Sequence, residues 1–189
     1  LWFEQDLFCI VNLLYVLAWY ARQPQRPPLR LVSGDMGRDA DLATKFREGA
    51  AVTTNMLGEG AELWDAYTSP DPTALSVGIW KARDHLTIPG AERAIGAHIA
   101  RYPTDTRMFL DAAEHSALKA LDRSPQTFGE LFATVSQQLP AYGYGDLQFY
   151  RVVRGLMRRG PALVGAPPLS QTRARTQYLP AWPLRITPA

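Results

Sequence analysis

Residues 1–33 read LWFEQDLFCIVNLLYVLAWYARQPQRPPLRLVS and contain the clearest structural pattern of the N-terminal part. Apolar residues recur at helical spacing from Leu7 to Ala21 and cover nearly every side, which predicts a helix that is buried on most of its faces. Short apolar stretches at 1–3 and, after several prolines, at 29–33 predict two strands. A strand, a helix and a strand in so short a segment predict one βαβ unit, whose strands run parallel.

The rest of the N-terminal part is expected to be mostly helical. Residues 34–60 are polar and rich in glycine and aspartate, with a short helical pattern at 40–47, and a longer helix is expected at 91–102. Two strands alone do not make a stable sheet, so further strands are expected. In addition, the chain begins inside an apolar segment and has no initiating methionine. We therefore expect a fragment, with an α/β domain remnant at 1–103 whose parallel sheet is incomplete without a preceding segment.

The C-terminal part carries three helical segments in succession. The first covers about 106–121, the second begins at the capping box Thr127-Phe128-Gly129-Glu130, and the third follows Asp146, a good N-cap residue. The chain from 161 onward has six prolines and no acidic residue, so we expect a wing-like hairpin and then irregular chain. This order predicts an α-rich, winged-helix-like domain of the helix-turn-helix kind at 104–165 and an irregular proline-rich tail at 166–189.

Composition excludes several classes of protein. The 189 residues are 47% hydrophobic and 20% charged, as in globular rather than disordered or collagen-like chains. The single cysteine, Cys9, excludes an intrachain disulfide and a multi-cysteine zinc site. The apolar segment 7–21 is shorter than the ~20 residues that span a bilayer, so we expect a cytoplasmic protein with no membrane partner. No phosphate-loop, zinc-protease or nucleophile-elbow motif occurs, which favours a non-enzymatic role without a cofactor.

Basic residues gather on one face of the third C-terminal helix. At 100° per residue, Arg151, Arg154 and Arg158 lie within an arc of about 60°, opposite the apolar face, and Arg159 follows them. From residue 147 onward there are seven arginines and no acidic residue, although the whole chain has a net charge of only +2. We therefore predict that these four arginines contact nucleic acid, with a solvated charged face as the alternative.

Two acidic residues follow the first predicted strand. Glu4 and Asp6 lie at the carboxyl end of a parallel strand, the edge at which open α/β sheets bind ligands. Two acids there could hold a cation or act as acid and base, whereas Asp6 could simply cap the next helix, where the helix dipole stabilises it. Glu4 and Asp6 are the predicted ligand-binding residues, with capping as the alternative. The histidines are not spaced as a metal pair, so no metal site is predicted.

Several short motifs occur in an order that is typical of one bacterial family. They are Leu1-Trp2-Phe3-Glu4-Gln5-Asp6-Leu7-Phe8-Cys9 with the leucine-rich helix after it, Ser69-Pro70-Asp71-Pro72, the helix from Leu86 to Pro103, Phe128-Gly129-Glu130-Leu131-Phe132, Gly145-Asp146-Leu147-Gln148-Phe149 and Gly160-Pro161-Ala162-Leu163. In this order the chain resembles domain-of-unknown-function family 1835 over about residues 1–165. Gln5 stands where that family usually has histidine, its N-terminal segment is absent, and the chain after Gly165 differs from its usual ending. The label sigma-factor-like, carried by some members, implies a link to transcription.

These patterns favour a protein that is nucleic-acid-associated or regulatory through its C-terminal domain, and the resemblance implies that it is bacterial. One alternative is a protein-interaction module, in which the same domain only mediates assembly. Another is an enzyme or nucleotide-binding protein that acts at Glu4 and Asp6. The expected partner is therefore a nucleic acid or another protein, and the sequence predicts no oligomeric state.

Overall fold

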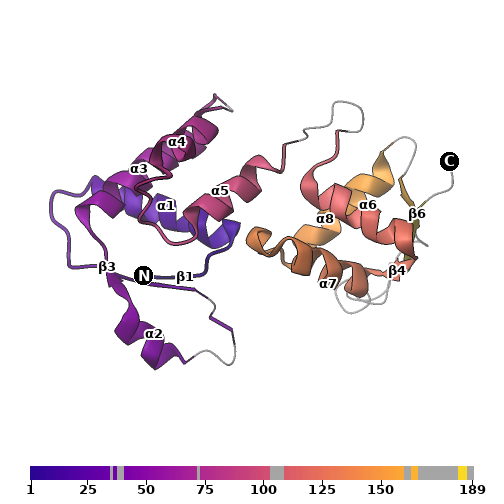
Figure 1. The fold of residues 1–189 in the computed structure, drawn as a ribbon, viewed down its shortest axis with the longest axis horizontal. Helices are drawn as coiled ribbons and strands as arrows, with labels where there is room; N and C mark the ends of the chain where they lie inside the picture. The colour runs from indigo at the N-terminus through magenta and orange to yellow at the C-terminus, as the bar shows by residue number, and fades with distance from the viewer. Residues whose placement is uncertain are drawn as a thin grey trace, which may run out of the picture. The chain divides into compact units, whose positions relative to one another are not determined.

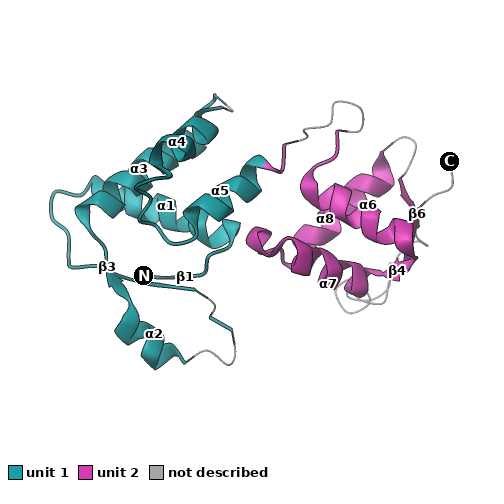
Figure 2. Cartoon of the chain, in the orientation of Figure 1, with its two compact units in different colours: residues 1–99 teal, residues 100–189 magenta. Residues whose placement is uncertain are grey.

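Figure 1 shows the computed structural model of the chain, which describes residues 1–34, 36–37, 41–71, 73–102, 109–159, 163–165 and 183–186. The chain forms two compact units, residues 1–99 and residues 100–189 (Figure 2). The division lies close to the expected boundary at 103–104, although residues 103–108 are outside the described residues. The expected tail belongs to the second unit.

Unit 1 begins with the predicted βαβ arrangement. Its elements are β1 (Trp2–Phe3), α1 (Leu7–Ala21) and β2 (Arg30–Ser33). The two strands pair in parallel, with Trp2 opposite Val32. α1 is 15 residues long. No helix in the described part of the chain has the length and hydropathy that crossing a membrane requires.

The sheet of unit 1 is mixed rather than purely parallel, which corrects the sequence prediction. β3 (Ala50–Ala51) pairs antiparallel with β2, so the strand order is β1-β2-β3. The helix before it, α2 (Leu42–Glu48), confirms the short helical pattern in this region. The sequence pattern misses β3 because two exposed alanines carry no strand signal.

Three more helices complete unit 1: α3 (Thr54–Tyr67), α4 (Ala74–Ala82) and α5 (Ala91–Ile99). The core gathers fully buried side chains of α1, among them Ile10 and Leu13, against α3 and α5. α1 and α3 approach closely at Gly60, where a Cβ atom would lie 2.5 Å from the Cβ of Leu17. A larger residue at this position would force the two helices apart, because close-packed interiors leave no room for it.

Unit 2 is helix-rich, as predicted, and carries a small antiparallel sheet. Its elements are α6 (Ala112–Arg123), β4 (Gln126–Thr127), α7 (Phe128–Gln138), a 3-10 turn η1 (Pro140–Tyr142), α8 (Asp146–Arg158), β5 (Val164–Gly165) and β6 (Pro183–Ile186). β6 pairs with both other strands, which gives the strand order β4-β6-β5. All three predicted helices are therefore present.

The helix starts of unit 2 follow local capping chemistry. The predicted capping box of α7 is confirmed: the Glu130 backbone N–H donates to the Thr127 hydroxyl at 3.3 Å, and the Thr127 backbone N–H donates to the Glu130 carboxylate at 2.8 Å. α8 differs from the prediction, because Gly145 is its cap and Asp146 its first residue. The Gly145 backbone N–H donates to the Gln148 side chain at 2.9 Å.

A buried aromatic cluster holds the helices of unit 2 together. The rings of Phe128 and Phe132 on α7 each lie 5.6 Å from the ring of Phe149 on α8. Phe128 and Phe149 are among the largest fully buried side chains of the chain. Their burial fixes which side of α8 faces the core, and therefore which side faces solvent.

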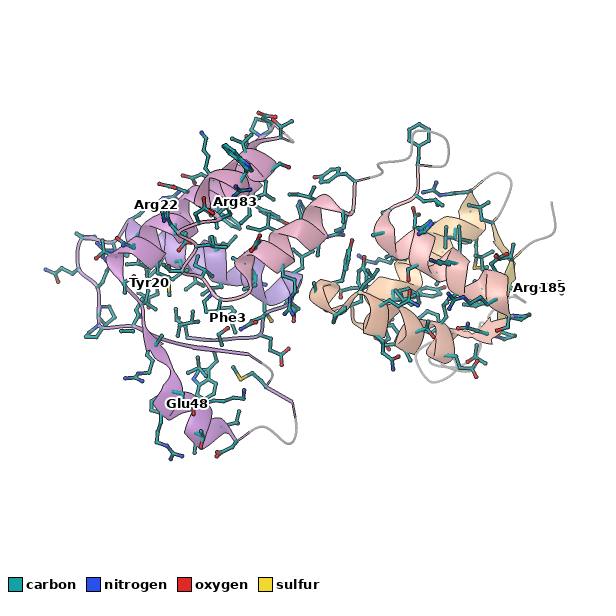
Figure 3. All side chains as sticks on the ribbon, in the orientation of Figure 1. Phe3, Tyr20, Arg22, Glu48, Arg83 and Arg185 are labelled. Carbon is teal, nitrogen blue, oxygen red and sulfur yellow. The ribbon has the colours of Figure 1, made fainter. Side chains whose placement is uncertain are left out.

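Part of the expected irregular tail, 166–189, is a strand, which corrects the sequence prediction. Along β6 the side chain of Leu184 is buried at 1% exposure and Arg185 is exposed (Figure 3), the alternation of a strand with one face on a core. Pro183 takes the first strand position, where proline is tolerated. The proline-rich composition hides this strand from sequence reading. Residues 166–182 and 187–189 lie outside the described residues.

Candidate functional site

The arginine face of α8, defined as Arg151, Arg154 and Arg158, lies on the solvent side of the helix. Arg151 and Arg158 are exposed and Arg154 is half-buried. The opposite side of α8 is fully buried; it consists of Phe149, Val153 and Leu156. The structure therefore brings together three of the four arginines predicted from the sequence.

Asp146, the first residue of α8, is the only acidic residue of this helix, so no acidic side chain within α8 lies close to the arginine face. The guanidinium of Arg154 lies 5.5 Å from the centre of the Tyr150 ring, a distance at which the ring attracts the cation. This contact restricts Arg154 without neutralising it. Arginine offers several planar N–H donors, which suit paired oxygen atoms such as those of a phosphate.

Arg159, the fourth predicted arginine, is engaged in contacts within unit 2. One of its terminal nitrogens contacts both carboxylate oxygens of Glu114, at 2.9 and 2.8 Å, and donates to the Phe109 carbonyl at 3.0 Å. The Glu114 side chain is only 13% exposed. Arg159 thus ties the end of α8 to the start of α6, and its charge is balanced within unit 2.

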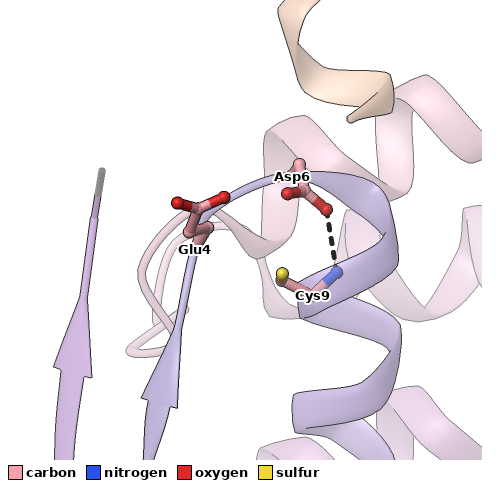
Figure 4. A group of neighbouring side chains, drawn as sticks. All are labelled: Glu4, Asp6 and Cys9. Carbon is pink, nitrogen blue, oxygen red and sulfur yellow. Dashed lines mark hydrogen bonds between the residues drawn. The ribbon is translucent and has the colours of Figure 1, made fainter. Parts of the chain in front are cut away.

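A second candidate site lies at the carboxyl end of β1. Side-chain ligand atoms of Glu4, Asp6 and Cys9 lie within 4.8 Å of one another (Figure 4). Glu4 accepts a hydrogen bond from the Met36 backbone N–H at 3.0 Å, and Asp6 accepts one from the Cys9 backbone N–H at 2.8 Å. Both predicted residues therefore meet at the sheet edge. Asp6 also caps α1, the alternative that the sequence left open.

The thiol of Cys9 is held in its neutral form by its surroundings. Burial raises its pKa above the ordinary value of 9.0, and the Asp6 and Glu4 carboxylates raise it further, against a hydrogen bond from the Glu4 backbone that lowers it. A protonated thiol is a weak nucleophile, so covalent catalysis by Cys9 is disfavoured. Two carboxylates at this helix start repel a phosphate and instead favour a cation.

Sequence reading missed Cys9 as a member of this group because it lies inside an apolar helix. The spacing of the two residues could have indicated the group: Cys9 is three residues after Asp6, so both lie in the first turn of α1.

A small cavity of about 280 Å³ lies near the ends of β1 and β2. Gln5 and Ser33, which share a hydrogen bond of 3.3 Å, line it together with Lys45. Gln5 packs against Gly90, which has a φ of +79° and no room for a Cβ atom, since one would lie 2.7 Å from the Cβ of Gln5. No local pattern indicates these residues, because they come from separate segments of the chain.

Comparisons of the chain with protein-family models, curated protein sequences and solved structures find no match. The resemblance to domain-of-unknown-function family 1835 therefore stays a prediction.

Proposed function

We propose that unit 2 is a winged-helix-like unit that binds duplex nucleic acid through the arginine face of α8. The order helix, strand, helix, helix, strand, strand is the order of a winged helix. The sheet order β4-β6-β5 supports the same assignment, since the last strand lies between the other two. In helix-turn-helix proteins a helix at the place of α8 enters the major groove.

The observation that carries the proposal is the exposure of basic residues on the side of α8 that faces away from the core. An α-helix with its side chains is about 10–12 Å wide and fits the major groove of DNA, which is about 12 Å wide. Arginines on the exposed side can then reach the phosphates that flank the groove. Such contacts supply affinity without base preference, so we propose binding that depends strongly on salt and weakly on sequence.

The test is binding of the full chain to a fluorescein-labelled DNA duplex of mixed sequence, followed by fluorescence anisotropy at low ionic strength. The variant replaces Arg151, Arg154 and Arg158 with alanine. We expect its affinity to fall by at least about tenfold, because each arginine neutralises one phosphate in the complex. The three side chains lie off the core, so the circular dichroism spectrum should not change.

The matched control removes the same charge elsewhere. Arg26, Arg47 and Arg83 are exposed residues of unit 1, and their joint replacement with alanine should leave the affinity within about threefold of the wild type. An equal loss of DNA affinity in both triple variants would mean that the net charge of the chain, and not the position of the arginines on α8, determines binding. Absence of salt-dependent binding to DNA or RNA by the intact chain would end the proposal and favour the protein-interaction module.

A second candidate function, ligand binding at Glu4 and Asp6, is favoured by their position with Cys9 at the sheet edge. The double replacement Glu4→Gln and Asp6→Asn keeps the shapes of both side chains. If they bind a cation, titration of the full chain with Co²⁺ should give a visible absorption change that the double variant loses, while its melting temperature stays close to that of the wild type. An identical response of the two proteins would leave only the capping role of Asp6.

The resemblance stated above supports a regulatory role in the bacterial cytoplasm, and we propose that compartment for the protein. Fluorescence microscopy of the tagged chain in a bacterial cell should give signal throughout the cytoplasm or over the nucleoid. Signal confined to the cell envelope would contradict it.

A further inference from the structure

A cleft between α3 and α4 shares Thr87 with the small cavity described above, but its other lining residues differ. Its volume is about 490 Å³, within the range of about 300–1,000 Å³ that small-molecule pockets occupy. Leu63, which is 1% exposed, provides an apolar part of its wall. Gly58 leaves space on the same helix, since no atom lies within 4 Å of the position that its Cβ would take. The cleft therefore has room for a small ligand beside an apolar surface.

Three exposed polar side chains, one acidic and two that can carry positive charge, line this cleft. Glu62 comes from α3, Lys81 from α4, and His85 from the segment that follows α4. Within the described part of the chain, the side chains of these three residues form no ion pair or hydrogen bond.

The remaining acid of the cleft, Glu59, is already engaged. Its carboxylate accepts hydrogen bonds from the Thr87 backbone N–H at 2.8 and 3.0 Å and from the Thr87 hydroxyl. These bonds hold the segment after α4 against α3. The lining thus also contains one carboxylate, one ammonium group and one imidazole that are exposed and have no partner in the described part of the chain.

We propose that this cleft binds a small zwitterion of the size of an α-amino acid. Lys81 and His85 receive the ligand carboxylate, and Glu62 receives its ammonium group. The ligand side chain lies over Leu63 and into the space beside Gly58. Charge-assisted hydrogen bonds of this kind are stronger than neutral ones, and a ligand with both charges can engage the acidic and the basic groups of the cleft at the same time.

The experiment titrates the full ¹⁵N-labelled chain with a panel of free α-amino acids and follows amide chemical shifts. At least one amino acid should shift amides of α3 and α4 with saturation in the millimolar range. Its N-acetyl and its carboxamide derivatives, which each lack one charge, should bind at least about tenfold more weakly.

A substitution that fills the cleft with a side chain tests whether the ligand binds there. Gly58→Leu places a side chain in the open space, and leucine is a better helix former than glycine, so this variant should fold and lose binding. Gly96→Leu is the matched control, because Gly96 is an exposed glycine of α5 that also has no atom within 4 Å of its Cβ position. It should bind as the wild type does.

Three results would overturn the proposal. The first is that no free amino acid binds at millimolar concentration. The second is that Gly58→Leu binds as well as Gly96→Leu, which would move the ligand away from the cleft. The third is that the single-charge derivatives bind as tightly as the free amino acid, which would show that the cleft does not recognise both charges of the ligand.

Discussion

Replacing Leu184 with alanine removes a side chain of β6 that is 1% exposed in the core of unit 2. β6 pairs with both β4 and β5, so Leu184 lies on the central strand of the small sheet. Buried leucine-to-alanine changes cost about 2–5 kcal/mol, and for this fully buried side chain we expect a loss of ~3 kcal/mol. A residue of an irregular tail would cost far less.

The assay is native-state hydrogen exchange of the full chain, because it follows the two units separately. A loss of ~3 kcal/mol should speed exchange of the most protected amides of α7 and α8 about a hundredfold, at ~1.4 kcal/mol for each factor of ten. Amides of α1 serve as an internal reference. Arg185→Ala is the control, since the neighbouring side chain is exposed and its removal should change stability by less than about 0.5 kcal/mol.

A loss of stability below about 1 kcal/mol for Leu184→Ala, or a loss equal to that of Arg185→Ala, would contradict a core position for Leu184, because removing a buried leucine side chain costs more than that. In that case β6 would not be part of the core that positions α8.

Asp6→Ala should lower the free energy of unfolding, measured by urea titration, by about 1 kcal/mol. Asp6→Asn should keep most of that stability, because asparagine also caps helices. Equal losses in the two variants would contradict the capping role. Gly90→Ala should destabilise unit 1 by at least about 1–2 kcal/mol, since its φ is +79° and the new Cβ would meet Gln5; a neutral change in thermal melting would oppose this. Hydrogen bonds from Thr127 lower the pKa of Glu130 below its ordinary 4.5. Because the pKa of Glu130 is lower in the folded than in the unfolded state, its ionised carboxylate stabilises the fold at a pH above the unfolded-state pKa. This stabilisation is lost as the pH falls through the folded-state pKa, so unit 2 should become less stable in acid. Glu130→Gln should reduce that pH dependence. Identical acid melting of both proteins would refute it.

Elements with a complete local signal could be predicted from the sequence. α1 follows from a long run of apolar residues that ends at a proline stretch, and α7 follows from the Thr127–Glu130 capping box. The parallel pairing of β1 and β2 follows from the helix between them. In each case the residues that determine the structure are close together in the sequence.

Elements whose stability comes from distant partners could not be predicted. β3 consists of two alanines that become a strand only beside β2, and β6 is a short segment of a proline-rich stretch that becomes a strand only between β4 and β5. No helix was predicted at 74–82, where α4 begins shortly after the prolines of Ser69-Pro70-Asp71-Pro72.

The candidate sites divide in the same way. The arginine face follows from helical periodicity, because Arg151, Arg154 and Arg158 share one side of a single helix. The ion pair of Arg159 with Glu114 joins residues that are 45 positions apart, so no local pattern indicates it. The α3–α4 cleft likewise depends on the packing of two helices, one of which the sequence did not reveal.

The measurement that tests the nucleic-acid proposal most directly is the salt dependence of duplex DNA binding by the full chain. The logarithm of the affinity should fall linearly with the logarithm of the salt concentration, and each phosphate contact adds about 0.9 to the slope. Replacing Arg151, Arg154 and Arg158 with alanine should therefore flatten the slope by about 2 to 3 units. The triple replacement of Arg26, Arg47 and Arg83 should leave the slope unchanged. A slope that is the same in the wild type and the α8 variant would show that α8 does not contact the phosphates, and would contradict the account.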